Sequence, residues 1–244
     1  MKIYVAHFLS AMTELMRSPG YWVPTILFPV MFYMFFGVAV AGRGANPALV
    51  MASFAVYGVV GVAFYQFGVG IAQDREMHWE KFVRTLPGSA PARIAARLIT
   101  AAIFASLAAG IVLFAAHFFS APGISGRQLV LFGLVCFAAS TPFALMGIAL
   151  GYWTNAKTAV PISNMVFLPL AFLGGLWIPP SAMPSSIAAI SQYTPTRHMA
   201  ELAWATMLDR SLPGESMGFL AGYAVIFAGL AYIGYRRDEG RRYA

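Results

Sequence analysis

The sequence has 244 residues, of which 59% are hydrophobic, 15% aromatic and only 10% charged, and its mean hydropathy is +0.70. Soluble domains carry about 25% charged residues, so this composition excludes an ordinary soluble enzyme. The net charge of +7 does not indicate a nucleic-acid binder, because the basic residues stand between hydrophobic segments and not together on one face. The single cysteine, Cys136, excludes a disulfide framework and a cysteine-based metal site.

Six stretches lack Asp, Glu, Lys and Arg and are long enough to cross a bilayer as a helix, which needs about 20 apolar residues. They cover residues 21–42, 47–73, 98–119, 128–155, 158–178 and 216–235. We therefore predict an all-α integral membrane protein with a single transmembrane domain, 1–244, and six transmembrane helices. We predict that the first stretch is a membrane span and not a cleaved signal peptide, because its apolar region is longer than the roughly 7 to 15 apolar residues of a signal peptide.

The distribution of basic residues predicts the orientation of these helices. Twelve of the 16 Lys and Arg residues fall in segments that six spans would place on the side of both termini. By the positive-inside rule, the N- and C-termini are then cytoplasmic. We expect a multi-pass protein of the plasma membrane, which is the inner membrane in bacteria.

Helix breakers and small residues inside the spans predict kinks and close packing. Prolines in spans are tolerated where neighbouring groups satisfy the freed carbonyls, a role expected here of Ser140 and Thr141. The prolines that mark expected kinks are Pro24, Pro29, Pro142, Pro161 and Pro169. Two pairs of glycines are predicted to pack helices within the bundle, Gly147 with Gly151 and Gly218 with Gly222.

Residues 2–18 predict an N-terminal amphipathic helix at the cytoplasmic interface. Apolar and polar side chains recur at helical spacing on opposite faces: Tyr4, Phe8, Met12 and Leu15 against His7, Ser10, Glu14 and Arg17. Such a helix can be a plain membrane anchor or a lever packed against neighbouring cytoplasmic elements. The pattern is compatible with both.

The loop at residues 74–97, after the second span, contains a second amphipathic pattern. Trp79, Phe82, Val83 and Leu86 stand at positions i, i+3, i+4 and i+7, which predicts a short helix ending before Pro87. An aromatic stripe flanked by charges of both signs is typical of a protein contact.

The segment 179–215 is the longest connection between spans and is predicted to face outward. It contains two short helical patterns, at 185–192 and 196–208, that are too short to span a membrane and too apolar to be surrounded by water. We predict a re-entrant helical hairpin between spans five and six. The residues that characterise it are Pro180, Pro184, Pro195 and Trp204.

Polar groups inside spans are candidates for a substrate pathway, because each must find a partner in lipid. The candidates are Tyr57, Tyr65, Gln66, Ser163 and Asn164. For Gln66 and Asn164, pathway lining and hydrogen bonding between helices are both open. Charged residues are absent from the predicted spans, which argues against an ion-coupled relay. An aromatic, uncharged lining suits a hydrophobic or amphipathic drug, a lipid or a lipid-linked molecule.

Two stretches of the sequence resemble the ABC-2 family of ATP-binding-cassette permeases, the membrane subunits of type V exporters. Residues 75–89, with the sequence REMHWEKFVRTLPGS, are similar to the family's loop after span two. The outward runs GGLWIPP at 174–180 and YTPTRH at 193–198 are similar to its proline-rich segment. The order of spans and surface helices resembles the family over the whole length.

The resemblance implies that residues 74–86 form a coupling helix that docks on a separate ABC ATPase subunit. The residues expected in this contact are Arg75, Glu76, Trp79, Glu80, Phe82, Val83, Arg84 and Leu86. It further implies a second permease copy, in a homo- or heterodimer within the lipid bilayer, and efflux such as multidrug export.

Catalysis is expected to reside outside this chain. The sequence lacks the G-x-x-x-x-G-K-[ST] phosphate loop, so ATP and Mg²⁺ are expected on the partner ATPase. We expect no catalytic residue, no cofactor, no metal site and no nucleic-acid partner in this chain.

Two other classes of membrane protein compete with an ABC permease: a secondary carrier or channel, and a membrane-embedded enzyme. A secondary carrier or channel would need no ATPase, but it often has charged intramembrane residues or visible paired broken helices. A membrane-embedded enzyme is less favoured, because the four histidines lie in different segments and no H-E-x-x-H or G-x-S-x-G motif occurs.

Overall fold

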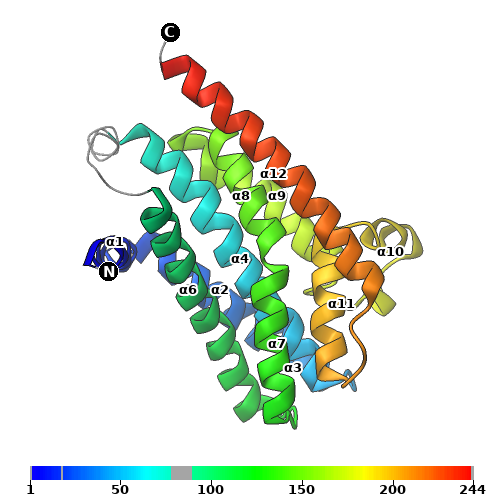
Figure 1. The fold of residues 1–244 in the computed structure, drawn as a ribbon. Helices are drawn as coiled ribbons and strands as arrows, with labels where there is room; N and C mark the ends of the chain where they lie inside the picture. The colour runs from blue at the N-terminus through cyan, green and yellow to red at the C-terminus, as the bar shows by residue number, and fades with distance from the viewer. Residues whose placement is uncertain (1, 18, 78–89, 243–244) are drawn as a thin grey trace.

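The computed structural model describes residues 2–17, 19–77 and 90–242, and the regular structure in these ranges is helical (Figure 1). The first half contains α1 (Lys2–Met16), α2 (Pro19–Phe32), the π-helix η1 (Tyr33–Gly37), α3 (Val38–Ala41), α4 (Pro47–Glu76) and α6 (Ala90–Phe119). The second half contains α7 (Gly126–Ala139), α8 (Thr141–Trp153), α9 (Ala156–Leu173), the 3₁₀-helix η2 (Pro180–Ala182), α10 (Ser185–Ser191), α11 (Pro195–Met207) and α12 (Gly214–Arg242).

Five helical segments in the described residues are long and apolar enough to cross a membrane. They are Pro47–Glu76, Ala95–Phe119, Gly126–Trp153, Ala156–Leu173 and Gly214–Glu239. The described residues therefore form an all-helical, multi-pass membrane protein. The predicted first span, 21–42, corresponds to α2, η1 and α3, which follow one another without a break and whose apolar part, Thr25–Ala41, is shorter.

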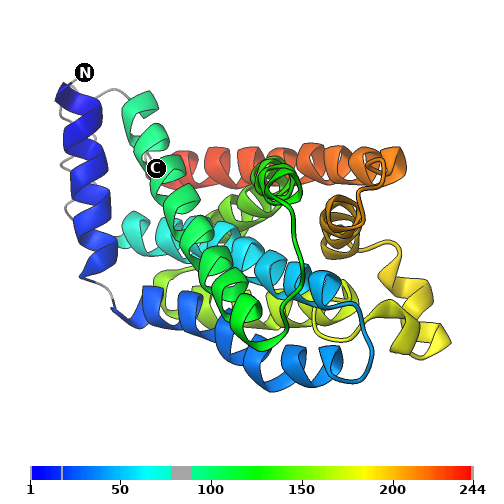
Figure 2. The same cartoon turned by 90° about the horizontal axis from the view of Figure 1, so that it is seen from below.

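Helix α4 lies at the centre of the bundle and contacts α2, α6, α8, α9 and α11 (Figures 1 and 2). In its most apolar 18-residue window 89% of the residues are buried, against at most 39% in the other four segments. The other helices therefore present most of their surface to the surroundings, while α4 is almost wholly enclosed by protein. Polar side chains in the enclosed part of α4 must find their partners inside the bundle.

Local capping explains where several helices begin. The side chain of Asn46 accepts a hydrogen bond from the Ala48 amide at 2.9 Å, and Pro47 occupies the first turn of α4. Capping boxes start α7, through Ser125 and Gln128, and α9, through Asn155 and Thr158. These caps satisfy the amides that a helix start leaves without intrahelical partners.

The predicted fourth span is interrupted at Ser140, where α7 ends and α8 begins. The Ser140 hydroxyl donates to the Phe137 carbonyl at 2.8 Å, two residues before Pro142. The helix is interrupted beside Pro142, where a kink is expected. The carbonyl that Pro142 leaves without its usual partner is that of Ala138, so the Ser140 hydroxyl bonds a neighbouring carbonyl and not the expected one. The predicted fifth span, 158–178, is too long: α9 ends at Leu173, and Gly175 adopts a left-handed φ of 77°.

Glycines allow the backbones of α4 and α8 to meet. A Cβ atom on Gly147 would lie 2.5 Å from the Phe64 carbonyl oxygen, and one on Gly151 would lie 2.7 Å from that of Gly68. The predicted packing of this pair within the bundle is confirmed. The prediction for Gly218 and Gly222 is wrong, because a Cβ at either position meets nothing within 4 Å.

Helix α1 lies across the bundle: it is seen end-on in Figure 1 and along its length in Figure 2. Its Met12 and Leu15 pack against a small buried cluster formed by Val62, Phe104 and Ala108. Tyr4, Val5 and Leu9, nearer the N-terminus, are about half exposed. The helix is therefore docked on α6 and α2 by its C-terminal half and is not an isolated anchor.

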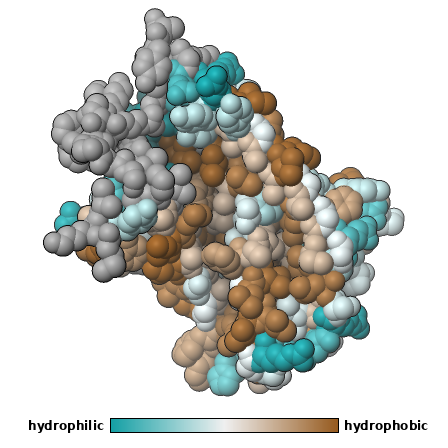
Figure 3. All heavy atoms as spheres, in the orientation of Figure 1, coloured by the Kyte–Doolittle hydropathy of each residue, from teal (hydrophilic) through white to brown (hydrophobic). Residues whose placement is uncertain are grey.

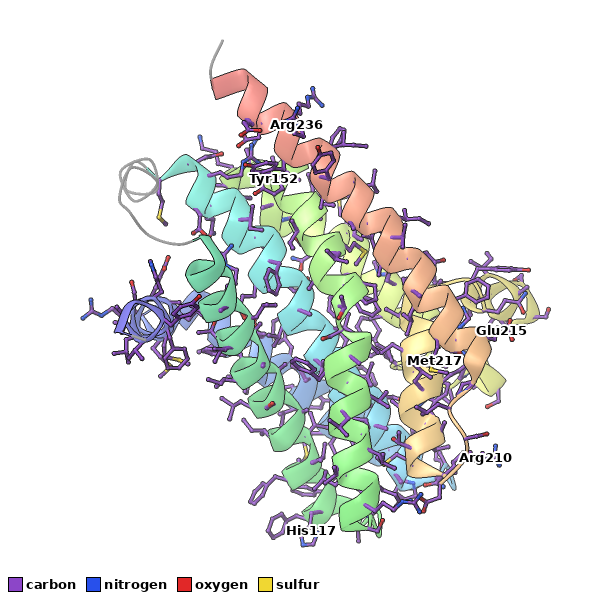
Figure 4. The ribbon with its side chains drawn as sticks, in the orientation of Figure 1. His117, Tyr152, Arg210, Glu215, Met217 and Arg236 are labelled. Atoms are coloured by element: carbon purple, nitrogen blue, oxygen red, sulfur yellow. The ribbon has the colours of Figure 1, made fainter. Side chains whose placement is uncertain are left out.

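The surface seen in Figure 3 is dominated by hydrophobic residues across its middle, with hydrophilic residues at its two ends. Figure 4 shows Tyr152 and Arg236 at one end of the bundle and His117 and Arg210 at the opposite end. An apolar belt between polar ends is the surface expected of a bundle surrounded by lipid.

The contact between α4 and α8 predicts a specific sensitivity to added volume. We expect Gly147→Ala to lower the thermal unfolding midpoint of the detergent-solubilised protein, because the new methyl group would clash with the Phe64 carbonyl. Overpacking costs about 1–3 kcal/mol, more than the roughly 1 kcal/mol that Ala gains over Gly within a helix. Gly222→Ala, in open space, is the control and should keep or raise the midpoint. Equal midpoints for the two variants would contradict the packing.

Candidate functional site

A cavity of about 660 Å³ opens between α1, α2, α4, α6 and α9. This volume falls within the range of about 300–1,000 Å³ that is typical of sites for drug-sized ligands. Four of the five predicted pathway residues line it: Tyr57, Tyr65, Gln66 and Asn164. Glycines 58, 61 and 70 of α4 also face it, and their lack of side chains leaves room beside the central helix.

Ser163, the fifth predicted pathway residue, is placed elsewhere. It is fully buried, and it is not among the residues that line the cavity. In the described part of the chain its hydroxyl has no hydrogen-bond partner. Asn164 faces the cavity while Ser163 does not, because adjacent residues on a helix point about 100° apart.

Aromatic rings close the cavity toward the C-terminal end of α9. Tyr57 stacks on Phe167 with ring centroids 5.1 Å apart and meets Phe32 at 5.7 Å. Trp177 contacts both Tyr57, at 5.6 Å, and Phe32, at 5.4 Å. Clusters of this kind offer apolar ring faces and polar ring edges to a ligand.

Hydrogen bonds between helices cross the middle of the cavity wall. The Tyr65 hydroxyl donates to Asn164 Oδ1 at 2.5 Å, which joins α4 to α9. Gln66 Nε2 donates to Thr100 Oγ1 at 2.9 Å, and Thr100 donates in turn to the Arg97 carbonyl at 3.0 Å, which joins α4 to α6. The two roles left open for Gln66 and Asn164 therefore coexist: each lines the cavity and each bonds a neighbouring helix.

The opposite end of the cavity is charged, because Asp74 from α4 and Arg97 from α6 line it and form an ion pair. Glu14 from α1 is a third charged residue in the cavity lining. Tyr57 and Asp74 are 17 residues apart on one helix, which corresponds to about 26 Å at 1.5 Å per residue. Along this length the lining changes from charged, through neutral polar groups, to aromatic.

The residues predicted to contact an ATPase begin at this charged end. The Arg75 side chain forms an ion pair with Asp238 and donates to the Gly151 carbonyl at 2.7 Å, while Glu76 accepts from the Ala156 amide at 2.9 Å. The remaining predicted contact residues, Trp79, Glu80, Phe82, Val83, Arg84 and Leu86, lie outside the described residues.

The segment 179–215 is docked on the bundle through α11. Trp204 Nε1 donates to Ser53 Oγ on α4 at 2.8 Å, and the Arg197 guanidinium lies 5.4 Å from the Trp204 ring. Pro195 is buried at the first turn of α11, Pro184 directly precedes α10, and Pro180 begins η2. The two short helices predicted at 185–192 and 196–208 are confirmed as α10 and α11.

A polar cluster between α11 and α12 was not predicted. Ser216 Oγ donates to Glu201 Oε2 at 2.8 Å and lies 3.1 Å from His198 Nδ1, so the His198 ring carries its proton on Nδ1. The spacing of 18 residues between His198 and Ser216 carries no periodic signal, so only the fold brings them together.

Comparison with known proteins agrees with this architecture. The ABC-2 type transporter family matches residues 6–208. YvfS of Bacillus subtilis, which is named as a transport permease, is 24% identical over 235 residues that cover 95% of this chain and 96% of YvfS. The daunorubicin resistance ABC transporter permease protein DrrB1 of Streptomyces coeruleorubidus is 26% identical, over 96% of this chain and 86% of DrrB1. The chain belongs to the ABC-2 type transporter family and is a transport permease.

The cavity predicts a pattern of thiol reactivity. In a Cys136→Ser background, which removes the native thiol, Asn164→Cys should react with a small charged thiol reagent in inverted membrane vesicles. Val56→Cys should not react, because Val56 is fully buried on the same bundle. Lack of labelling at both positions would show that water does not reach the cavity.

Proposed function

We propose that this chain is the membrane-spanning subunit of an ATP-driven exporter that moves an amphipathic or hydrophobic molecule out of the cytoplasm. The cavity carries the proposal, because it combines a charged end, neutral hydrogen-bonding groups and an aromatic end in one continuous space. An amphipathic molecule has the same division, with a polar head and an apolar body. Membership of the ABC-2 family supports export powered by a separate ABC ATPase.

In this proposal the chain has six spans with both termini in the cytoplasm. The five long helical segments are then preceded by a first span, which consists of α2, η1 and α3 and extends from Pro19 to Ala41. The excess of Lys and Arg on the side of the termini supports the orientation. The charged end of the cavity, at Asp74 and Arg97, then faces the cytoplasm, and the aromatic end faces outward. The membrane is the plasma membrane, or the inner membrane of a bacterium.

Helices α10 and α11 form the outward re-entrant hairpin in this arrangement. The burial of Leu202 and Ala203 against the bundle and the hydrogen bond from Trp204 to Ser53 support this placement. Polar side chains at membrane depth are tolerated when they are bonded within protein, as Glu201 is with Arg197 and Ser216.

The proposed substrates are drugs, lipids and lipid-linked molecules with an apolar ring or chain system. The stacked rings of Tyr57 and Phe167 present flat faces to such a molecule. The name of the relative DrrB1 links it to daunorubicin resistance, which supports a drug as one member of this class. Two permease copies and an ATPase that binds ATP and Mg²⁺ complete the proposed transporter, and residues 74–86 form its coupling segment.

Transport in vesicles tests this proposal. Inverted membrane vesicles that contain the permease with its ATPase should accumulate daunorubicin or a fluorescent phospholipid when ATP is added. We expect Tyr57→Ala to slow uptake by about 30-fold, because a buried aromatic anchor commonly contributes about 2 kcal/mol to binding. Phe137→Ala, at a lipid-facing position that is 69% exposed, is the matched control and should transport like the parent. Absence of ATP-dependent uptake of both probes would overturn the proposal.

The coupling segment is tested separately through Trp79. If Trp79 is an anchor in the ATPase contact, Trp79→Ala should leave membrane insertion unchanged and weaken ATPase binding by about 30-fold, which corresponds to about 2 kcal/mol. Co-purification of the ATPase with the solubilised permease measures this, with Phe137→Ala again as the control. A helix that only rests on the lipid surface would instead show altered insertion with the ATPase contact intact.

A further inference from the structure

The last residues of α4 hold three other helix ends. Arg75 Nη1 donates to the Gly151 carbonyl at 2.7 Å and to the Thr154 carbonyl at 3.2 Å, both at the C-terminal end of α8. Its guanidinium also lies 5.4 Å from the Tyr152 ring. A cation at this position neutralises the partial negative charge of the α8 C-terminus.

The same guanidinium reaches the end of α12. Its Nε lies 3.1 Å from Asp238 Oδ1, and its Nη2 bonds the same carboxylate oxygen. The two side chains are only 17% and 12% exposed, so each charge depends on the other for compensation. The ion pair therefore fixes the cytoplasmic part of α12 to the end of α4.

Glu76 makes the complementary contact with the neighbouring helix. Its Oε1 accepts from the amide of Ala156, the first residue of α9, at 2.9 Å. An anion at a helix N-terminus is favourable for the same reason as a cation at a C-terminus. Two consecutive residues of opposite charge thus hold the two sides of the turn between α8 and α9.

These contacts leave little of the Arg75 guanidinium to reach a separate protein, whereas Glu76 is exposed and is held through one of its two carboxylate oxygens. The three nitrogens of the Arg75 guanidinium all donate within the chain. Residues 78–89, which contain most of the predicted ATPase contact, begin two positions after Glu76. On its α4 side, a displacement of this segment reaches the bundle through Arg75 and Glu76, and on its other side the segment continues into α6.

We propose that Arg75 and Glu76 are positioning residues that transmit movement of the coupling segment to α8, α9 and α12, without touching the ATPase themselves. This inference rests on the proposed function and refines the role of two residues of the coupling segment. The route leads to the cavity, because Asn164 in the cavity wall is eight residues from Ala156 on the same helix. That distance is about two helical turns.

The test uses the complete permease–ATPase complex and two measurements. Co-purification of the ATPase measures assembly. The second measurement is the labelling rate of Leu168→Cys, a reporter in the cavity wall placed in a Cys136→Ser background, with and without a non-hydrolysable ATP analogue. The variants are Arg75→Lys, which keeps the charge but not the forked contact, and Glu76→Ala, with Glu76→Gln as the conservative version that retains an acceptor oxygen.

We expect Arg75→Lys and Glu76→Ala to retain ATPase co-purification within about twofold. The effect of nucleotide on the labelling rate should fall by about tenfold. This loss equals about 1.4 kcal/mol, which lies within the range of about 0.5–3 kcal/mol for coupling between residues in contact. Glu76→Gln should recover most of the response. A disulfide between Glu76→Cys and Ala156→Cys should also restore it, because the covalent bond replaces the hydrogen bond.

Loss of ATPase co-purification in Arg75→Lys and Glu76→Ala would overturn the inference and assign both residues to the ATPase contact. A nucleotide response equal to that of the parent in both variants would also overturn it. If the parent chain co-purifies with no ATPase, the proposed function itself fails, and this result is distinct from either of the others. Thermal unfolding of each variant in detergent identifies any loss of folding. If Arg75→Lys does not fold, Glu76→Ala provides the answer, with Glu76→Gln as its control.

Discussion

The close approach of α4 and α8 is the constraint on which the rest of the bundle depends. Lipid offers no hydrophobic drive for helices to associate, so packing and hydrogen bonds between helices must hold the bundle together. Gly68, Gly147 and Gly151 let the two backbones meet without intervening side chains. With α8 in place, α4 is enclosed by α2, α6, α9 and α11, and its polar groups acquire fixed partners. The cavity keeps its shape because its central wall is rigid.

Polar groups on α4 then determine what each part of the bundle can do. Near the N-terminal end of α4, Ser53 accepts a hydrogen bond from the Trp204 indole and holds α11, while in the middle Tyr65 and Gln66 bond α9 and α6. At the charged end Asp74 pairs with Arg97 of α6. Each bond satisfies a group that would otherwise be costly in lipid, and several of these groups also face the cavity. Stability and ligand recognition therefore use the same side chains.

Much of the fold was predictable, because apolar length and capping residues are local signals. Pathway candidates were found for a similar reason: polar groups in spans are rare, and four of the five line the cavity. Ser163 could not be separated from Asn164, because the rotation of α9 depends on its neighbours. The glycine pair at 218 and 222 was misassigned, since a small-residue pair does not reveal whether a partner helix is present. The His198, Glu201 and Ser216 cluster joins two helices whose contact no periodicity encodes.

The order of charges at the end of α4 gives a physical reason why one helix can line the cavity and also hold several neighbouring helices. Asp74, Arg75 and Glu76 are consecutive, so their side chains leave the helix in different directions, about 100° apart. Asp74 turns to α6, Arg75 to α8 and α12, and Glu76 to α9. A rotation or displacement of the last turn of α4 must therefore move α6, α8, α9 and α12, or break its contacts with them. Because packed interiors yield in discrete steps and not continuously, such a turn favours a few distinct arrangements of the cavity wall.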